Sequence, residues 1–409
     1  MGKILSGKIR MLFSAMILAV LSFGFVSCSE EPEEEKERLI LIYAVVSSDL
    51  SSWFGLDKAE IEEVAPALDL EHNAVMVYYA APGGESRLEK LTRNKDGSIR
   101  FELERSYETL PLSTSKERIS EVLNYVAENY DYQRKGLIFW GHGTGWVEWP
   151  QGGNLESALT DARADEPADS RRKAYGAQNH EGKTYRTNIP ELAEAIPAGK
   201  YDFIWFDCCY MASIENIYQL RHKSPYVVGY VMEVYNPGAP YNLILPHLLR
   251  RDADLTGAAN DFFEYYNSGD SGYAPHVSVS VIKTSGLDRL AEAAAGIYSD
   301  GQPPASFGHI QNYSRYVQKE NGNNGYNVSF PFYDLGQLLG SYGTPGGSYA
   351  VKLQEALDET VVFKKISTTD FSGKIIDMEG YSGLSVCNYD PGNIYAEFYR
   401  ELDWYKATR

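Results

Sequence analysis

The chain has 409 residues, with 38 Lys and Arg against 56 Asp and Glu, and a formal net charge of −18 at pH 7. This length is typical of two or three domains of about 100–200 residues each, and a hydrophobic share of 44% predicts a mostly globular chain. The acidic balance argues against a nucleic-acid partner, because phosphates would repel the protein. Only four cysteines occur, Cys28, Cys208, Cys209 and Cys387, and the adjacent pair is too strained to bridge readily, so no disulfide framework is predicted.

The N-terminus has the composition of an export signal. Basic residues near the start precede an apolar run over 11–26, a pattern typical of a signal peptide and short for a membrane span. The run ends in Phe25-Val26-Ser27-Cys28, which resembles the lipobox of bacterial lipoproteins. Residues 1–27 are therefore predicted to be a lipoprotein signal peptide and Cys28 the lipidated residue. A plain secretory signal cut near Ser27 is the alternative.

An acidic run over residues 29–37 follows the cysteine. It is either a solvated tether or, by its position, similar to the surface-export signal of Bacteroidetes lipoproteins. Residues 28–38 are predicted to form an acidic tether. Because several acyl chains together anchor a protein stably, we expect an exported protein that is lipid-anchored to the bacterial outer membrane and exposed on the cell surface.

From residue 39 onward, apolar runs of strand length alternate with helical patterns. The predicted strands cover 39–46, 74–80, 136–140, 201–206, 226–232, 276–282 and 381–386, with a polar hairpin over 88–105. The predicted helices cover 51–68, 114–126, 211–220, 287–297 and 394–405, and Thr114 with Glu117 forms a capping-box signature. Continuous apolar strands separated by helices predict a mostly parallel sheet with helices on both faces.

Residues 150–186 differ from the rest of this pattern. They are polar and include Gly152-Gly153, several acidic residues, Arg163 and the basic run Arg171-Arg172-Lys173. Loops of this length within a compact domain are usually functional or disordered. We therefore predict an inserted loop.

Two predicted strands end in reactive side chains. Gly141-His142-Gly143 follows strand 136–140, and Asp207-Cys208-Cys209 follows strand 201–206. Ligands of parallel sheets bind beyond the carboxyl ends of the strands, so neighbouring strands would place a histidine and a thiol in one cleft. An imidazole can balance the charge of a thiolate nucleophile and protonate a leaving amine. The adjacent glycines would let a substrate approach backbone N–H groups.

Together these segments resemble the motifs of the clostripain family of cysteine peptidases, which belongs with caspases, gingipains and legumain. That family shows HG-x-GW and D-x-C-x-M, which appear here as His142–Trp146 and Asp207–Met211, with a trailing Glu215. LIYAVVSSDL is similar to the family's first strand and loop, although Ser47-Ser48 replace the more usual acidic or Asn residues. Residues 381–386 and 399–408 are similar to its closing segments.

The resemblance implies an α/β fold with a caspase-like, mostly parallel sheet. Residues 39–240 would form the catalytic domain, and an additional C-terminal α+β region, 241–409, would pack on the sheet or complete it. His142 would be the catalytic base and acid and Cys209 the nucleophile, with the backbone N–H groups of Gly143 and Cys209 holding the oxyanion. Cys208 is expected to be a small buried residue, because only Cys209 matches D-x-C.

The resemblance also implies cleavage after Arg or Lys. Asp207 matches an acidic residue that lines the S1 pocket, and Glu233 is the candidate for a second one, although the residues after it depart from the family pattern. Several members cleave themselves between the histidine and cysteine strands, which makes Arg171, Arg172 and Lys173 candidate sites. The alternative is that these cations only keep the loop solvated.

Peptides or proteins are the expected substrates, and no cofactor is predicted to be required. His142, Cys208 and Cys209 lack the spacing of zinc ligands, so no metal site is predicted, while a calcium requirement like that of some relatives stays open. The oligomeric state is not predicted. The alternative function is a catalytically silent family member that serves as a binding module on the cell surface.

Overall fold

The fold is described over residues 36–409, with several gaps. A computed structural model describes residues 36–47, 49–80, 85–147, 175–269, 271–313, 332–343, 348–370, 373–391 and 396–409. All of these belong to one unit that extends from Lys36 to Arg409.

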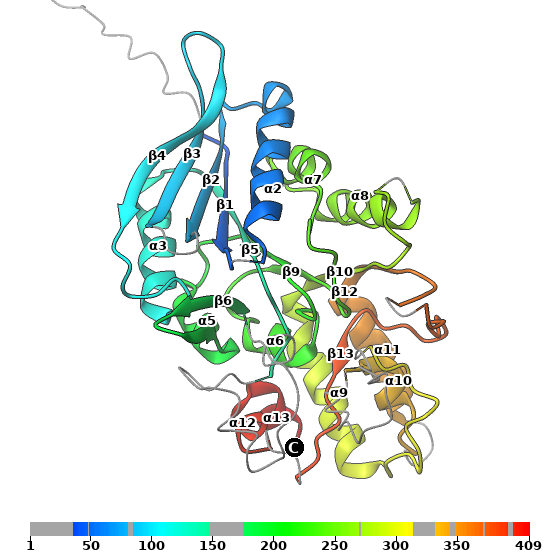
Figure 1. The fold of residues 1–409 in the computed structure, drawn as a ribbon. Helices are drawn as coiled ribbons and strands as arrows, with labels where there is room; N and C mark the ends of the chain where they lie inside the picture. Colours follow the sequence, from blue (N-terminus) through cyan, green and yellow to red (C-terminus); the bar gives the residue numbers. More distant parts are fainter. Residues whose placement is uncertain are drawn as a thin grey trace, which may run out of the picture. The chain divides into compact units, whose positions relative to one another are not determined.

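The core of that unit is a nine-stranded sheet with the order β12-β10-β9-β8-β5-β1-β2-β3-β4. Its strands are β1 (Arg38–Val45), β2 (Asn73–Ala80), β3 (Ser86–Arg93), β4 (Ile99–Tyr107), β5 (Arg134–Trp140), β8 (Phe203–Asp207), β9 (Tyr226–Gly229), β10 (Ser278–Lys283) and β12 (Val361–Ile366). The five strands from β2 to β9 in this order are parallel, and antiparallel strands complete the sheet at both sides (Figure 1). The expected α/β fold is confirmed.

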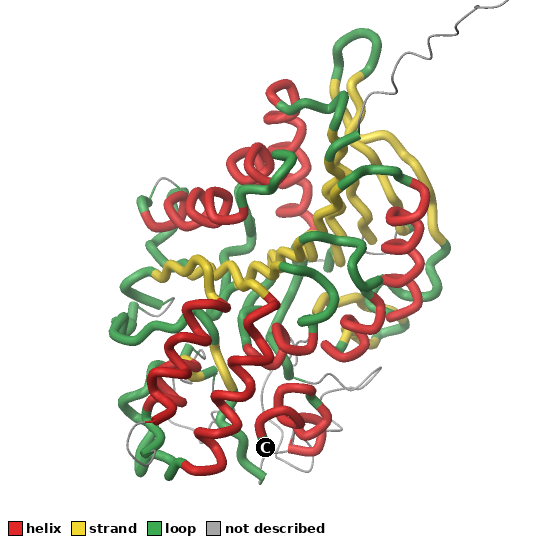
Figure 2. Tube along the Cα trace, turned by 180° about the vertical axis from the view of Figure 1, so that it is seen from behind, coloured by secondary structure: helices red, strands yellow, loops and turns green. Residues whose placement is uncertain are grey.

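Helices cover both faces of the sheet (Figure 2). Side chains from α2 (Ser51–Val64), α7 (Tyr241–Leu248) and α8 (Leu255–Asn267) pack in one hydrophobic cluster. Those from α3 (Lys116–Asn129), α5 (Ile189–Ala195), α6 (Ile214–Gln219), α9 (Leu287–Asp300), α10 (Leu335–Gly340), α11 (Ser348–Thr360) and α13 (Asp403–Thr408) pack in another. The 3-10 turns η1 (Ala65–Ala67) and η3 (Thr284–Gly286) precede β2 and α9.

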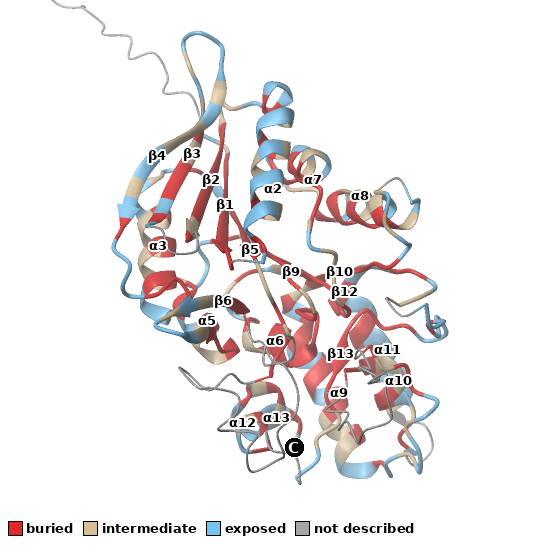
Figure 3. Cartoon of the chain, in the orientation of Figure 1, coloured by how far each residue is buried: buried red, intermediate tan, exposed pale blue. Residues whose placement is uncertain are grey.

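Residues 39–45 of β1 are all apolar because both faces of this strand are buried. Leu39, Leu41 and Tyr43 belong to the α3 side of the core, whereas Ile40 and Ile42 belong to the α2 side. Successive side chains of a strand point to opposite faces, and both faces are covered here. The central strands are accordingly buried along their length (Figure 3).

Two smaller sheets lie outside this core. The hairpin β6 (Tyr175–His180) and β7 (Lys183–Thr187) occupies part of the segment predicted to be an inserted loop. The predicted insertion therefore contains a regular hairpin over residues 175–186, in which β6 and β7 pair with a register shift between Tyr175 and Gln178. The other small sheet pairs β11 (Tyr333–Asp334) with β13 (Ser385–Val386), which is shorter than the predicted strand 381–386.

Several predicted boundaries move for local reasons. The N-cap of α3 is Ser115, whose hydroxyl accepts the Arg118 N–H at 3.2 Å, and not Thr114. Helix α6 begins at Ile214 and not at Met211, since Tyr210 turns the backbone with a φ of 61°. The single helix predicted over 394–405 is instead α12 (Ala396–Glu401) and α13, separated at Leu402.

Candidate active site

The register of the sheet brings the two predicted motifs together. In β5 and β8, which are parallel neighbours, Trp140 pairs with Asp207. His142 and Cys209 each follow two residues later, at the same edge of the sheet. The backbones are close enough that a Cβ added at Gly143 would lie 2.7 Å from Cys208 Cβ and 3.3 Å from Cys209 N. Only glycine permits this approach of the two turns.

The adjacent cysteines have opposite environments. Cys208 is fully buried, its thiol donates to the Phe139 carbonyl at 3.2 Å, and burial raises its pKa well above the usual value. Cys209 is partly exposed, and its Sγ accepts the Val234 N–H at 3.3 Å. A reactive thiol must be accessible and benefits from a donor that stabilises the thiolate. Of the two, only Cys209 meets these conditions.

His142 is held by a residue of the turn that follows the neighbouring strand β1. Its Nε2 lies 2.9 Å from Asp49 Oδ2, and the second carboxylate oxygen accepts the Ser47 hydroxyl. The bond to His142 is the main cause that holds the pKa of Asp49 well below its ordinary value. Sequence reasoning did not single out Asp49. The available signal was its position in the short polar turn after β1, at the same edge as the other two turns.

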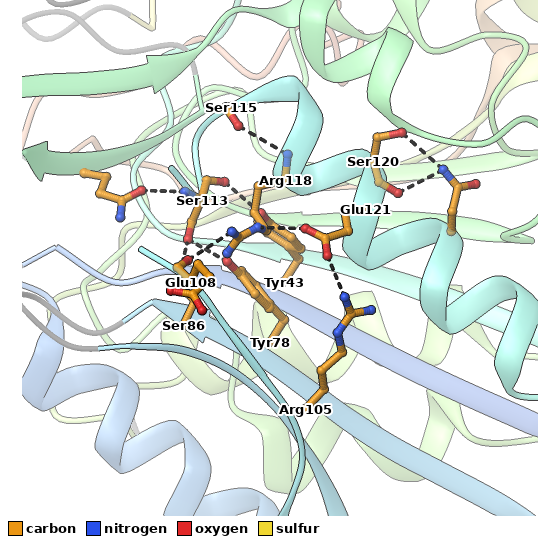
Figure 4. A network of polar contacts seen from close by, with 12 residues as sticks. Tyr43, Tyr78, Ser86, Arg105, Glu108, Ser113, Ser115, Arg118, Ser120 and Glu121 are labelled. Atoms are coloured by element: carbon orange, nitrogen blue, oxygen red, sulfur yellow. Dashed lines mark hydrogen bonds and ion pairs between the residues drawn. The ribbon is translucent and has the colours of Figure 1, made fainter. Parts of the chain in front are cut away.

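The hairpin β6–β7 is hydrogen-bonded to the histidine turn and to β1. Gly176 N–H donates to the His142 carbonyl at 2.8 Å, and the Tyr175 hydroxyl donates to the Tyr43 carbonyl at 2.7 Å. Ser113 links the same hairpin to β1, because its N–H donates to Gln178 Oε1 at 2.6 Å and its carbonyl accepts the Tyr43 hydroxyl at 2.7 Å (Figure 4). These bonds fix the backbone that carries the imidazole.

Asp207 is buried beneath the site. Its carboxylate accepts the Ala239 N–H at 3.0 Å and the hydroxyls of Tyr241 at 3.2 Å and Tyr230 at 3.5 Å. Burial raises its pKa to about 7 in spite of these bonds. A second buried carboxylate, Asp57 of α2, has its pKa raised to about 10 by burial and then by the charge of Asp207. Two carboxyl groups thus share one low-dielectric region.

Of the other candidate residues, the structure describes only Glu233. Glu233 follows β9, is half-buried, and its carbonyl lies 3.1 Å from His276 Nε2. Cys28, Arg163, Arg171, Arg172 and Lys173 lie outside the described residues. Within the described part of the chain, no group of three or more His, Cys, Asp or Glu side chains could hold a metal ion. None of the helices described is long and apolar enough to cross a membrane.

A cleft of about 350 Å³ lies elsewhere, at the carboxyl end of the edge strand β4. It is lined in part by Arg118, which binds Glu121 and the Glu108 carbonyl (Figure 4). Strands β3, β2 and β1 separate β4 from β5, which corresponds to roughly 20 Å at the usual strand spacing. The cleft is therefore not part of the candidate active site.

Comparison with known proteins shows the family to which the chain belongs. The model of the clostripain family matches residues 42–342 of the chain. The chain belongs to the clostripain family. This is a family of cysteine peptidases, and the chain has the corresponding α/β fold.

Solved structures show the same fold. A secreted C11 cysteine protease from Bacteroides thetaiotaomicron, solved with an irreversible peptide inhibitor, is 26% identical and matches over 91% of this chain and 98% of that chain, with a TM-score of 0.73. An inactive zymogen C11 protease from Parabacteroides distasonis is 23% identical, with the same coverage and TM-score. No curated protein matches the chain.

The Glu215 that trails the clostripain cysteine motif joins the site to the C-terminal region. Its Oε1 accepts the Cys387 N–H and the Tyr399 hydroxyl, both at 2.7 Å. Ser385 N–H also donates to the Ala212 carbonyl at 3.1 Å. Residues far apart in the sequence thus hold the turn after Cys209, and burial raises the pKa of Glu215 to about 7.

Proposed function

We propose that this clostripain-family member is an active cysteine endopeptidase with Cys209 as nucleophile and His142 as base and acid. The observation that carries the proposal is the partly exposed Cys209 thiol, placed beside the His142 turn at the ends of adjacent parallel strands. The related secreted protease from Bacteroides thetaiotaomicron binds an irreversible peptide inhibitor, which supports peptides as substrates here.

The reaction proceeds in two halves. Cys209 Sγ attacks the scissile carbonyl carbon as a thiolate, and the oxygen that becomes negative is held by the backbone N–H groups of Gly143 and Cys209. His142 then gives its proton to the leaving amine as the C–N bond breaks, which leaves a thioester. His142 next removes a proton from water, and the resulting hydroxide attacks the thioester carbonyl. The C–S bond then breaks, which regenerates the Cys209 thiolate and releases the carboxylate product.

Cleavage after Arg or Lys is part of the proposal, with Asp207 as the acidic floor of the S1 pocket. Its carboxylate already accepts three hydrogen bonds, so a substrate cation would replace one of the tyrosine hydroxyls. A guanidinium or ammonium group at this depth would also favour the ionised carboxylate. Glu233 is proposed as the second acidic residue of the pocket.

The remaining sequence expectations extend this proposal. The protein is exported and anchored to the outer membrane through lipidated Cys28, and it activates itself by cleavage near Arg171, Arg172 or Lys173. Its reaction needs no added cofactor. Calcium is the one ion to test by chelation, because some members of the family require it.

The test is turnover of fluorogenic peptides that end in Arg, Lys or Ala by the full chain. Cys209→Ala should abolish hydrolysis of the Arg and Lys peptides, while the matched variant Cys208→Ala should retain it. If none of the peptides is hydrolysed, even after mild nicking of the chain between the histidine and cysteine strands, the catalytically silent binding lipoprotein becomes the better description. A single intact band during sustained turnover would show that self-cleavage is not needed.

A further inference from the structure

Asp49 reaches the imidazole of His142 from an element outside both predicted motifs. Strand β1 is the parallel neighbour of β5, and Ala44 pairs with Trp140, so the turns after the two strands lie at the same edge. The Asp49 Oδ2 to His142 Nε2 distance is 2.9 Å. The His142 side chain is 19% exposed and that of Asp49 63% exposed, so the imidazole is largely shielded and the carboxylate is partly in solvent.

The position of the carboxylate is set by the turn that carries it. Ser47 donates its hydroxyl to Asp49 Oδ1, and Leu50 N–H donates to the Ser47 carbonyl at 3.1 Å. Phe54 N–H then donates to the Leu50 carbonyl, which joins this turn to α2. Both carboxylate oxygens are therefore engaged, one by the turn and one by the imidazole.

We infer that Asp49 is a positioning residue for His142, which keeps a proton on Nε2 and leaves Nδ1 to exchange the proton with Cys209. The reason is chemical: an ionised carboxylate can only accept a hydrogen bond, so the nitrogen that faces it must be the N–H donor. A neutral imidazole has one donor and one acceptor nitrogen, and the acceptor is then Nδ1. This inference rests on the proposed function of His142 and Cys209.

Asp49 also stabilises the protonated imidazole. Among the residues that the structure describes, the other titratable groups around the histidine turn are Tyr175 from β6, Asp207 at the end of β8, and Cys208 and Cys209 in the turn after it. Burial raises the pKa of Tyr175 and of Cys208 well above neutral, so both stay uncharged at neutral pH. Asp207 titrates near neutrality, but it does so in both a wild-type chain and an Asp49 variant. A difference between the two proteins therefore reports on Asp49.

The experiment compares the full wild-type chain with Asp49→Asn and Asp49→Ala. Asp69→Asn is the matched control, because Asp69 Oδ2 makes a similar bond of 2.8 Å to His72 Nδ1 in the turn before β2, away from the site. Two quantities are measured against pH: kcat/KM on the best peptide, and the rate at which iodoacetamide alkylates Cys209, followed by peptide mapping. The second needs no substrate.

We expect Asp49→Ala to lower kcat/KM by about 10- to 100-fold, less than the roughly 10²- to 10⁴-fold that general acid–base catalysis itself supplies. Asp49→Asn should recover part of the loss, because its amide oxygen can accept the same N–H. Without the negative charge, both limbs of the pH profile should move to lower pH, by about 0.5–1 unit for a half-exposed pair. The midpoint of Cys209 alkylation should move in the same direction.

The inference is overturned if both Asp49 variants keep the wild-type pH profiles, as Asp69→Asn is expected to do. If Asp49→Ala does not fold, Asp49→Asn, which has the same shape, carries the test alone. A shifted alkylation profile in a chain that hydrolyses no peptide would uphold the inference and refute the proposed peptidase. Asp49 variants that hydrolyse peptides with unchanged pH profiles would support the proposed peptidase and refute the inference about Asp49.

Discussion

Gly143→Ala tests the contact on which the candidate active site depends. A Cβ at this position would lie 2.7 Å from Cys208 Cβ and 2.7 Å from the Cys209 carbonyl oxygen. Ordinary contact begins at about 3.4 Å, so the histidine and cysteine turns would have to separate by about 0.7 Å. Neither contact can be relieved by rotating a flexible side chain, since one partner is a Cβ and the other is backbone.

A separation of this size is expected to reduce kcat/KM by about 10²-fold, because catalytic groups misplaced by about 1 Å lose that much. Overpacking should also cost about 1–3 kcal/mol of unfolding free energy. Peptide turnover measures the first effect and urea unfolding the second. Gly55→Ala in α2 is the matched control, since its Cβ would meet nothing within 4 Å and alanine stabilises a helix interior by about 0.5–1 kcal/mol.

The reasoning is refuted if Gly143→Ala keeps both the wild-type kcat/KM and the wild-type stability. That result would mean that the two turns are further apart than the register of β5 and β8 places them. A loss of stability without a loss of activity would show that the turns touch but that their spacing does not govern the reaction.

Four further predictions concern two buried carboxyl groups and the N-terminus. Glu215→Ala should cost about 2–4 kcal/mol, because the Cys387 N–H and the Tyr399 hydroxyl lose their acceptor, and urea unfolding would show it. Because burial raises the pKa of Glu215 from 4.5 to about 7, its contribution to stability is fully present below pH 4.5 and is lost as the pH rises to 7; Glu215→Gln should flatten that slope. Asp57→Asn should stabilise the chain increasingly between pH 4 and pH 10, since the folded protein keeps Asp57 protonated over this range; equal unfolding free energies of variant and wild type at pH 9 would contradict this. Cys28→Ala should move the protein from the membrane fraction to the soluble fraction on cell fractionation, and unchanged membrane association would contradict lipidation at that residue.

Much of the fold could be predicted because both faces of the central sheet are covered. Strands such as β1 and β5 are then continuously apolar after their first residues, over 39–45 and 136–140, and the sequence shows these stretches as continuous runs. The β3–β4 hairpin was also predicted, from its turn residues 95–97, and the structure confirms it.

The predicted boundaries of elements fail where the local sequence pattern is ambiguous. Residues 211–213 are apolar or small like the helix they precede, yet the turn at Tyr210 keeps them outside α6.

In the candidate site, too, the residues of local motifs could be predicted and their long-range partners could not. His142 and Cys209 could be identified because each motif is local and follows an apolar strand. Asp49 and Val234 could not, because their contacts join turns that are 93 and 25 residues away along the chain. Nothing in a linear pattern states which strands are neighbours, and so which polar turns meet.

The sequence by itself determined the kind of fold and which two residues are proposed as the reactive pair, since strand periodicity and the two motifs are properties of short segments. The tertiary structure alone decided that β1, β5, β8 and β9 place their carboxyl ends side by side, that Cys208 is buried while Cys209 is accessible, and that Asp49 binds His142. The physical reason is that burial and hydrogen bonding depend on what lies across the sheet, and that partner is set by the order of the strands.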